Sequence, residues 1–334
     1  MLAVRLWRHP KYGHIMTPTS LIKISDNLSD NQHKEIAEKI FARKIDGIEV
    51  SHFGGRWGDT WETGRNYSLD FLKFYKGIKA LRFYLTDVTD LTPILVLADD
   101  LENLQLGEFD LKKIPLEPLG QLKNLTYLSV VRNQNGLESI TQLPKLSELA
   151  LTGHSIEKLP FLNELTELKQ LYIGFGTSKN FDNIQSLSKL EELDVLWVKQ
   201  LSDIQAVSKL INLVKLRMED EKQITALPDL SKLTKLKNIR LMNFGSLEDV
   251  SALVNSNVEE FILTGPNKNA DFLKSLSNAK KLQKVYTFFY TKREQDKAEK
   301  ILGGKFCDKD KMNFDMPNRT PILYYDIETG QRIV

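Results

Sequence analysis

The sequence predicts an α/β solenoid, a stack of similar coils with a parallel sheet of about eleven strands on its concave face. Three observations support this. The pattern L-x-x-L-x-L, with conservative replacements, recurs ten times at intervals of 21 to 24 residues. An eleventh copy, Ile45-x-x-Ile48-x-Val50, precedes them after a longer gap. Prolines and apolar residues spaced by three between the copies favour short 3₁₀ or loosely helical returns. A leucine period of roughly 20–29 residues is typical of stacked repeats.

Each repeat starts with an apolar residue, and apolar residues return at its fourth and sixth positions. The ten regular copies begin at Ile78, Leu101, Leu125, Leu146, Leu168, Leu190, Leu213, Leu236, Val258 and Leu282. Because polar residues alternate with these positions, each copy predicts a half-buried strand. The side chains at positions three, five and seven are expected to point away from the core.

Residues 1–44 lack the period, and we expect them to form an N-terminal cap of short strands and one helix. The apolar cross-section at a solenoid end needs such a cover. Ser29 followed by Gln32 has the spacing of a helix capping box. The pattern places Ile36, Ile40 and Phe41 on the buried face of this helix.

Residues 291–334 also lack the period and are expected to form a C-terminal cap, with the repeats at 45–290 between the two caps. A helix is expected from Glu294 to Leu302, with Ile301 and Leu302 buried. Gly303 and Gly304 would end it. A hairpin around residues 327–330 is expected to follow.

An insertion after the first repeat, residues 52–66, is one candidate binding site. Insertions in solenoids form loops on one side, often the binding side. The candidate residues are His52, Arg56, Trp57 and Trp61. The two indoles either contact a ligand or fold over the cap, and both interpretations stay open. The glycines of this loop match no phosphate-binding pattern.

These repeats resemble the leucine-rich repeat (LRR) family over residues 45–290. They are most similar to bacterial internalin-type modules and to the short repeats of phosphatase-regulatory LRR proteins. The resemblance implies a right-handed parallel solenoid whose inner sheet face binds proteins. The family often has asparagine at the ninth repeat position, where its amide bonds neighbouring coils. Here only Asn133 fits this pattern, and His154, Gly176, Val198, Glu221, Phe244 and Pro266 occupy the other places.

The predicted open sheet face displays aromatic and charged side chains where solvent is expected. Tyrosine, tryptophan and arginine are enriched among the residues that dominate interface energies. The alternative is cross-strand packing, because aromatic side chains also stabilise neighbouring strands. The candidate partner-binding residues are Arg82, Tyr84, Tyr127, Arg132, Tyr172, Phe175, Asp194, Trp197, Arg217, Arg240, Tyr286 and Phe288.

Composition and motifs argue against several function classes. The net charge of +2 shows no electrostatic signature of nucleic-acid or membrane binding. The five histidines lack zinc-ligand spacing, and neither H-E-x-x-H nor G-x-S-x-G occurs. We therefore expect no cofactor and no enzymatic activity. The single cysteine, Cys307, excludes an internal disulfide. With no secretory signal in the first residues, we expect a cytoplasmic protein that is monomeric alone.

The function expected from the sequence is a non-enzymatic scaffold that binds a protein partner on its concave sheet face. A narrower alternative is an immunity or inhibitor protein that covers a toxin or enzyme. A second alternative is a small-ligand receptor or enzyme at the Trp57/Trp61 loop. Nucleic-acid binding by the basic segment between Lys268 and Lys311 is a third and weaker option.

Overall fold

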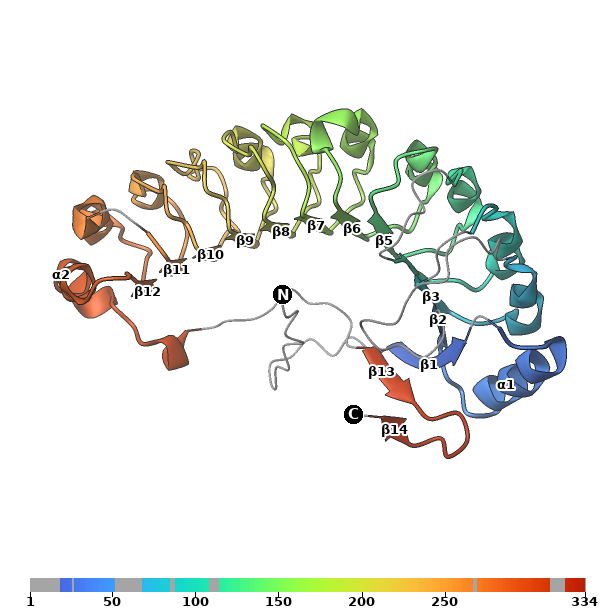
Figure 1. Cartoon of the computed structure of the whole chain (residues 1–334). Coiled ribbons are helices and arrows are strands. Elements are labelled where there is room, and N and C mark those ends of the chain that lie inside the picture. Colours follow the sequence, from blue (N-terminus) through green and yellow to red (C-terminus); the bar gives the residue numbers. More distant parts are fainter. Residues whose placement is uncertain are drawn as a thin grey trace.

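The computed structural model is a horseshoe with strands on its inner face and short helices on its outer face (Figure 1). It describes residues 19–25, 27–51, 68–84, 88–107, 114–266, 269–312 and 322–333. The strands are β1 (Thr19–Ser25), β2 (Gly47–Ser51), β3 (Ala80–Tyr84), β4 (Asn103–Leu106), β5 (Tyr127–Val131), β6 (Glu148–Thr152), β7 (Gln170–Gly174), β8 (Glu192–Leu196), β9 (Lys215–Glu219), β10 (Asn238–Met242), β11 (Glu260–Thr264), β12 (Lys284–Phe288), β13 (Ile322–Tyr325) and β14 (Arg332–Ile333). The α-helices are α1 (Asp30–Ala42) and α2 (Lys292–Leu302).

Strands β2 to β12 coincide with the eleven copies of the repeat pattern, each of which was predicted to form a strand. Each of them begins two residues after the first apolar residue of its repeat, as β8 does after Leu190. From β1 to β12 the strands are parallel neighbours in the order of the sequence. The architecture is a leucine-rich-repeat solenoid, so the predicted fold class is confirmed.

One continuous core runs through the stack. In the repeat that starts at Leu190, the first, fourth and sixth residues are all buried, and the same holds along the sheet. The second half of each repeat adds its own row of buried apolar side chains, such as Ile204, Val207 and Leu210. Each coil therefore shields the apolar residues of the next, which is why the repeats are stable only as a stack.

Most of the outer returns contain a short 3₁₀ helix, as the prolines and the spacing of three predicted, but the return between β9 and β10 does not. Pro160 begins one of them, at a position where its missing N–H is not needed. The 3₁₀ helices of the returns are Asp70–Tyr75, Thr92–Leu97, Glu117–Gln121, Leu137–Gln142, Ile156–Lys158, Pro160–Glu164, Asp182–Ile184, Gln205–Lys209, Ser251–Leu253 and Ala270–Asn278. Two more 3₁₀ helices, Gly303–Lys305 and Lys309–Lys311, follow α2.

Helix α1 covers the N-terminal end of the repeats. The capping box forms as predicted, with the Ser29 backbone N–H donating to Gln32 Oε1 at 2.9 Å. The buried stripe, however, is His33, Ala37 and Ile40, whereas Phe41 is 43% exposed. The prediction for Phe41 was wrong because the helix packs through the i, i+4, i+7 line that begins at His33.

Helix α2 covers the other end of the sheet. It starts at Lys292, two residues before the predicted position, and Gly303 with φ +52° ends it. It packs against β12 and the 3₁₀ helix Ala270–Asn278. Ala298 and Leu302 are its buried residues, and Ile301 is only partly buried.

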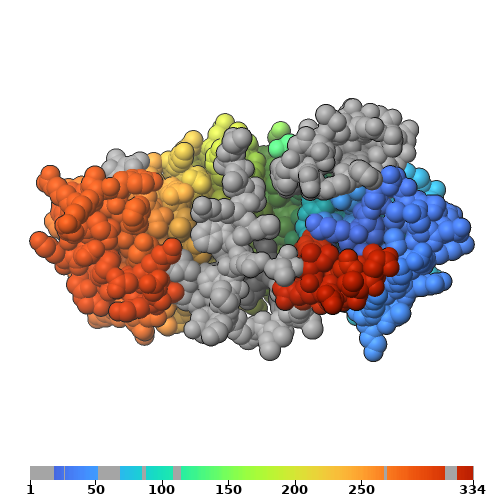
Figure 2. Space-filling view, turned by 60° about the horizontal axis from the view of Figure 1, so that its bottom comes forward, coloured from blue at the N-terminus to red at the C-terminus, as the bar shows by residue number. Residues whose placement is uncertain are grey.

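The hairpin formed by β13 and β14 lies at the opposite end of the molecule from α2. β13 pairs in parallel with β1, where Thr19 faces Ile322, and β14 completes the hairpin. Figure 2 shows the hairpin (red) against the N-terminal elements (blue) and apart from α2 (orange). The two halves of the expected C-terminal cap therefore lie at opposite ends of the sheet.

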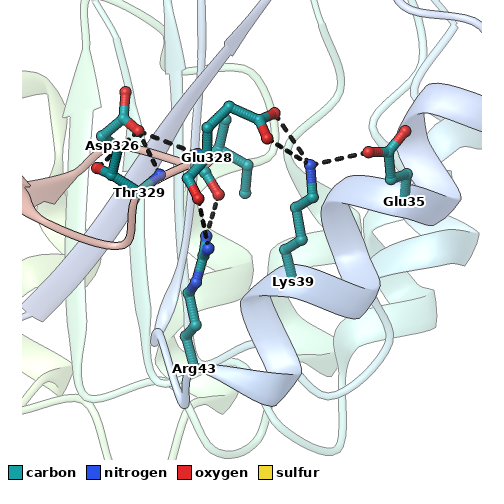
Figure 3. Close-up of polar contacts among 7 residues, drawn as sticks. Glu35, Lys39, Arg43, Asp326, Glu328 and Thr329 are labelled. Atoms are coloured by element: carbon teal, nitrogen blue, oxygen red, sulfur yellow. Dashed lines mark hydrogen bonds and ion pairs between the residues drawn. The ribbon is translucent and has the colours of Figure 1, made fainter.

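Polar contacts hold the hairpin turn onto α1 (Figure 3). Lys39 forms ion pairs with Glu35 and Glu328, at 2.8 and 2.9 Å. The Arg43 guanidinium donates to the carbonyl oxygens of Ile327 and Glu328, the latter at 2.7 Å. The hairpin therefore contributes to the N-terminal cap, and β1 is not a free sheet edge.

In the part of the chain that the structure describes, neither α-helix is long and apolar enough to span a membrane.

Candidate functional site

The inner face of the sheet carries three rows of side chains, formed by the third, fifth and seventh residues of each repeat. The strand register places equivalent residues side by side, so that Asp194 on β8 faces Arg217 on β9, and Arg217 faces Arg240 on β10. The predicted residues that lie in these rows are Arg82, Tyr84, Tyr127, Tyr172, Asp194, Arg217, Arg240, Tyr286 and Phe288. The other three, Arg132, Phe175 and Trp197, each directly follow a strand, at the rim of the face.

At the N-terminal end of this face, Arg82 and Tyr84 contact the chain's own hairpin. The Arg82 guanidinium lies 3.0 Å from Glu49 and donates to the Tyr324 hydroxyl at 2.5 Å. It also donates to the Tyr84 hydroxyl. Lys23 lies over the Tyr324 ring, 4.5 Å from its centroid. Burial, together with the hydrogen bond to Glu49, raises the pKa of Tyr324, so its hydroxyl stays protonated. Arg82 and Tyr84 therefore have a structural role that the sequence did not indicate.

A shallow hollow opens between β5 and β8. Tyr127, Glu148 and Tyr172 line it together with Glu192. Burial, with the nearby charge of Glu192, raises the pKa of Glu148 to about 7. The absence of a side chain at Gly174 leaves room for the Tyr172 hydroxyl, because a Cβ there would lie 2.2 Å from that oxygen. This part of the face is aromatic and acidic.

A second shallow hollow lies between β8 and β11. Arg217 on its floor bonds to Asp194 at 3.1 Å and to Glu219 at 2.8 Å. Burial lowers the pKa of the neighbouring Arg240 to about 10, and the charge of Arg217 acts in the same direction. Ile262 on β11 forms an apolar part of the wall. This part of the face combines opposite charges at close range.

The rim residue at the eighth position of the repeat has a left-handed backbone in seven successive coils. Gly153, Gly265, Asn243 and Asp220 occupy four of these positions, and such residues tolerate this conformation well. The remaining three are Arg132, Phe175 and Trp197, with φ of 57°, 55° and 49°.

Phe175 and Trp197 form an aromatic pair on neighbouring coils of this rim. Their rings meet edge to face, with centroids 5.8 Å apart and planes at 79°. They are 49% and 43% exposed. Lys199 lies 5.8 Å from the Trp197 ring centroid. A bulky side chain in a left-handed backbone is strained, so local stability does not explain these two residues.

A second exposed aromatic pair lies at the C-terminal end of the rows. The rings of Phe288 and Tyr290 are 6.1 Å apart at 83°, and Tyr290 is 64% exposed. Tyr286 lies in the fifth-position row of the same strand, and burial raises its pKa. Sequence reasoning missed Tyr290 because it follows the strand, although the alternation of Tyr286, Phe288 and Tyr290 continues to it.

The ninth-position residues bond neighbouring coils even where asparagine is missing. The Asn133 side-chain amide donates to the Ile114 carbonyl at 2.8 Å, and His154 Nε2 lies 3.0 Å from the Asn133 carbonyl oxygen. The Val198 backbone N–H donates to Glu221 Oε1 at 2.8 Å. Burial raises the pKa of Glu221 to about 8, and the charge of Asp220 adds to the rise. Asparagine, histidine and glutamate side chains at the ninth position thus all form a hydrogen bond to the backbone of the neighbouring coil.

The candidate loop residues His52, Arg56, Trp57 and Trp61 lie outside the described residues, so their role stays a prediction. Within the described ranges, no group of three histidine, cysteine, aspartate or glutamate residues is arranged to hold a metal ion. Cys307 is partly buried.

Comparison with known proteins gives matches among solved structures. No protein-family model matches the sequence, and no curated protein matches it either. Among solved structures, an internalin from Listeria monocytogenes is 17% identical with a TM-score of 0.46, and the match covers 79% of this chain and 68% of that one. Internalin C2 from the same organism is 22% identical with a TM-score of 0.46, covering 64% and 91%. A leucine-rich-repeat protein of Leptospira interrogans is 14% identical with a TM-score of 0.42, covering 80% and 90%.

Proposed function

We propose that the protein is a non-enzymatic scaffold that binds a folded protein partner on its concave sheet face and the adjoining rim. The observation that carries this proposal is the Phe175–Trp197 pair. Both side chains occupy a left-handed position for which four other coils use glycine, asparagine or aspartate and a fifth uses arginine. A non-glycine residue in that region costs roughly 1–2 kcal/mol of conformational free energy.

Within the isolated chain, burial of the two rings offsets little of this conformational free energy. Both rings remain about half exposed, so much of their apolar surface is in contact with water. A protein partner that covers them would remove this surface from solvent, which is worth about 25 cal/mol per Å². Aromatic side chains also lose few rotamers on binding. The pair is therefore better suited to an interface than to the free solenoid.

The neighbouring rows supply the polar part of such an interface. Tyr127 and Tyr172 lie on the acidic side of the face, and Arg217 and Arg240 lie toward its other end. Aromatic anchors next to charged groups are typical of the centre of a protein interface. Because the sheet is held rigid by its core, little ordering entropy would be lost on binding.

The test is affinity capture from native cells, followed by binding of the purified captured protein. Wild type is compared with the double variant Phe175→Asn/Trp197→Asn, in which asparagine suits the left-handed backbone. We expect the wild type to bind one protein and the double variant to bind it at least 100-fold more weakly. Ile211→Asn is the matched control, because Ile211 is exposed on an outer return, away from the face. Equal affinity of wild type and double variant would contradict the proposal.

A further inference from the structure

The hollow between β5 and β8 is lined by carboxylates, and its own strands supply no cation to it. In the row of third-position residues, Glu148 on β6 faces Gln170 on β7, and Gln170 faces Glu192 on β8. In the row of fifth-position residues, Tyr172 faces Asp194. None of the third, fifth or seventh residues of β5 to β8 is a lysine or an arginine. This part of the face is therefore negatively charged by its composition.

Two of these three carboxylates are compensated by cations on the next strand, β9. Glu192 pairs with Lys215 at 3.2 Å, and Asp194 pairs with Arg217 at 3.1 Å. Glu148 lies three strands from β9, which is roughly 14 Å at the strand spacing of a parallel sheet. Its carboxylate has no ion pair and no hydrogen bond with any residue that the structure describes. Glu148 is therefore the carboxylate of this hollow that lacks a counter-ion in the described part of the chain.

Two tyrosines lie on the strands on either side of Glu148. Tyr127 on β5 is directly opposite Glu148, and Tyr172 on β7 is opposite Ala150, the fifth-position residue of β6. All four side chains line the hollow. Because a Cβ at Gly174 would lie 2.6 Å from Tyr172 Cζ, the Tyr172 ring extends along its own strand over Gly174. Aromatic faces attract a cation that lies within about 6 Å of the ring centroid.

We propose that this hollow receives a lysine or arginine side chain of the protein partner, with its cationic end beside Glu148 and its aliphatic stem against Tyr127 and Tyr172. The inference rests on the proposed function, because it names the chemistry of the partner at one point of the binding face. An ammonium or guanidinium group would form a charge-assisted hydrogen bond with the carboxylate. The two rings would add cation–π attraction and contact with the aliphatic stem.

The electrostatics of the hollow favour a cation. Burial and the charge of Glu192 raise the pKa of Glu148 to about 7. A cation beside Glu148 would stabilise its ionised form and would offset the repulsion from Glu192. An anion in the same place would be repelled by Glu148, Glu192 and Asp194, all of which line the hollow.

The experiment uses ethylguanidinium and butylammonium as probes, because they reproduce the ends of arginine and lysine side chains. The side-chain carboxyl ¹³C signal of Glu148 in the full chain is followed by NMR through a pH titration, and Glu148→Gln assigns the signal. Each probe replaces sodium at equal ionic strength, and its Kd is measured from the same signal. Glu138, exposed on the outer return Leu137–Gln142, is the internal reference.

We expect each probe to lower the titration midpoint of Glu148 and to leave that of Glu138 in place. At ten times the Kd the midpoint should fall by about one pH unit, because only the ionised carboxylate binds a cation. Tyr172→Leu should weaken probe binding about fivefold. Tyr290→Leu, which removes an exposed tyrosine outside the hollow, should not. Thermal melts of both variants establish that they are folded.

A Glu148 midpoint that moves no more than that of Glu138 would overturn the proposal. Equal probe binding by Tyr172→Leu and Tyr290→Leu would also overturn it. If the proposal holds, the probe with the lower Kd identifies the partner residue as arginine or lysine. Because no partner is present, these results are independent of the capture experiment.

Discussion

The Tyr324 hydroxyl donates to Glu49 at 2.5 Å, although 275 residues separate the two in sequence. This bond joins the C-terminal hairpin to the first repeat and lies beside Arg82 at the end of the inner face. An exposed strand edge is prone to pair with other chains. The hairpin covers the edge of β1 and so protects the N-terminal end of the solenoid.

Removing the Tyr324 hydroxyl is expected to weaken the attachment of the hairpin to the first repeat. In Tyr324→Phe, the buried Glu49 loses one hydrogen-bond donor, which should lower the free energy of unfolding by about 1–3 kcal/mol. The backbone amides of β1 should exchange faster with deuterium. Tyr325→Phe, on the opposite face of the same strand, is the control. Unchanged stability and exchange in Tyr324→Phe would show that this hydrogen bond does not stabilise the attachment of the hairpin.

The contacts in Figure 3 predict unequal roles for the two cations of α1. Arg43→Ala removes donors to two backbone carbonyls, and we expect a loss of about 1–2 kcal/mol in unfolding free energy. Lys39→Ala removes only ion pairs with exposed glutamates, so its loss of unfolding free energy should be smaller than that of Arg43→Ala. Urea denaturation measures both variants, and an equal or larger loss for Lys39→Ala would contradict this ranking.

Glu221 should make the protein less stable as the pH rises. Its folded pKa of about 8 lies above the ordinary value of 4.5, so between these values the folded state binds more protons than the unfolded chain. Stability is therefore full below about pH 4.5 and falls as the pH rises toward 8. Glu221→Gln keeps an acceptor for the Val198 N–H but cannot ionise.

Denaturant unfolding at pH 5 and pH 9 tests this effect. The two proteins should have similar stability at pH 5, and Glu221→Gln should be more stable than wild type by roughly 2–4 kcal/mol at pH 9. A stability difference that does not change with pH would mean that Glu221 ionises normally in the folded chain.

The strained aromatic pair predicts a variant that keeps its stability. Phe175→Asn/Trp197→Asn loses an edge-to-face ring contact but relieves two left-handed aromatic residues. We expect the unfolding free energy to change by less than about 1 kcal/mol, since the two effects are of similar size. Truncation of packed aromatic residues typically costs about 3–5 kcal/mol. A loss of that size would favour the alternative that these rings serve cross-strand packing.

Much of the fold could be predicted because the apolar period reports burial directly. The eleven strands begin at the same offset from each repeat's first apolar residue, and the Ser29 capping box is a local signal. The attachment of the hairpin to β1 could not be predicted, because no periodic pattern connects residues 322–333 to residues 19–25. Strand pairing of this kind depends on backbone geometry and chain reach.

The candidate face was predictable in its composition but not in its geometry. Alternation identified which side chains leave the core, including Tyr172 and Arg217. It could not show that Tyr324 contacts Arg82, since that contact depends on the hairpin. The left-handed backbone at Phe175 and Trp197 also could not be predicted from the sequence, because phenylalanine and tryptophan rarely adopt it.

Hydrogen exchange of the chain with and without its captured partner tests the proposed binding face most directly. We expect slower exchange in peptides that contain β7 to β10 and the rim at Phe175 and Trp197, with no change in the outer returns. Protection confined to the outer returns, or absent from β7 to β10, would contradict binding on the concave face.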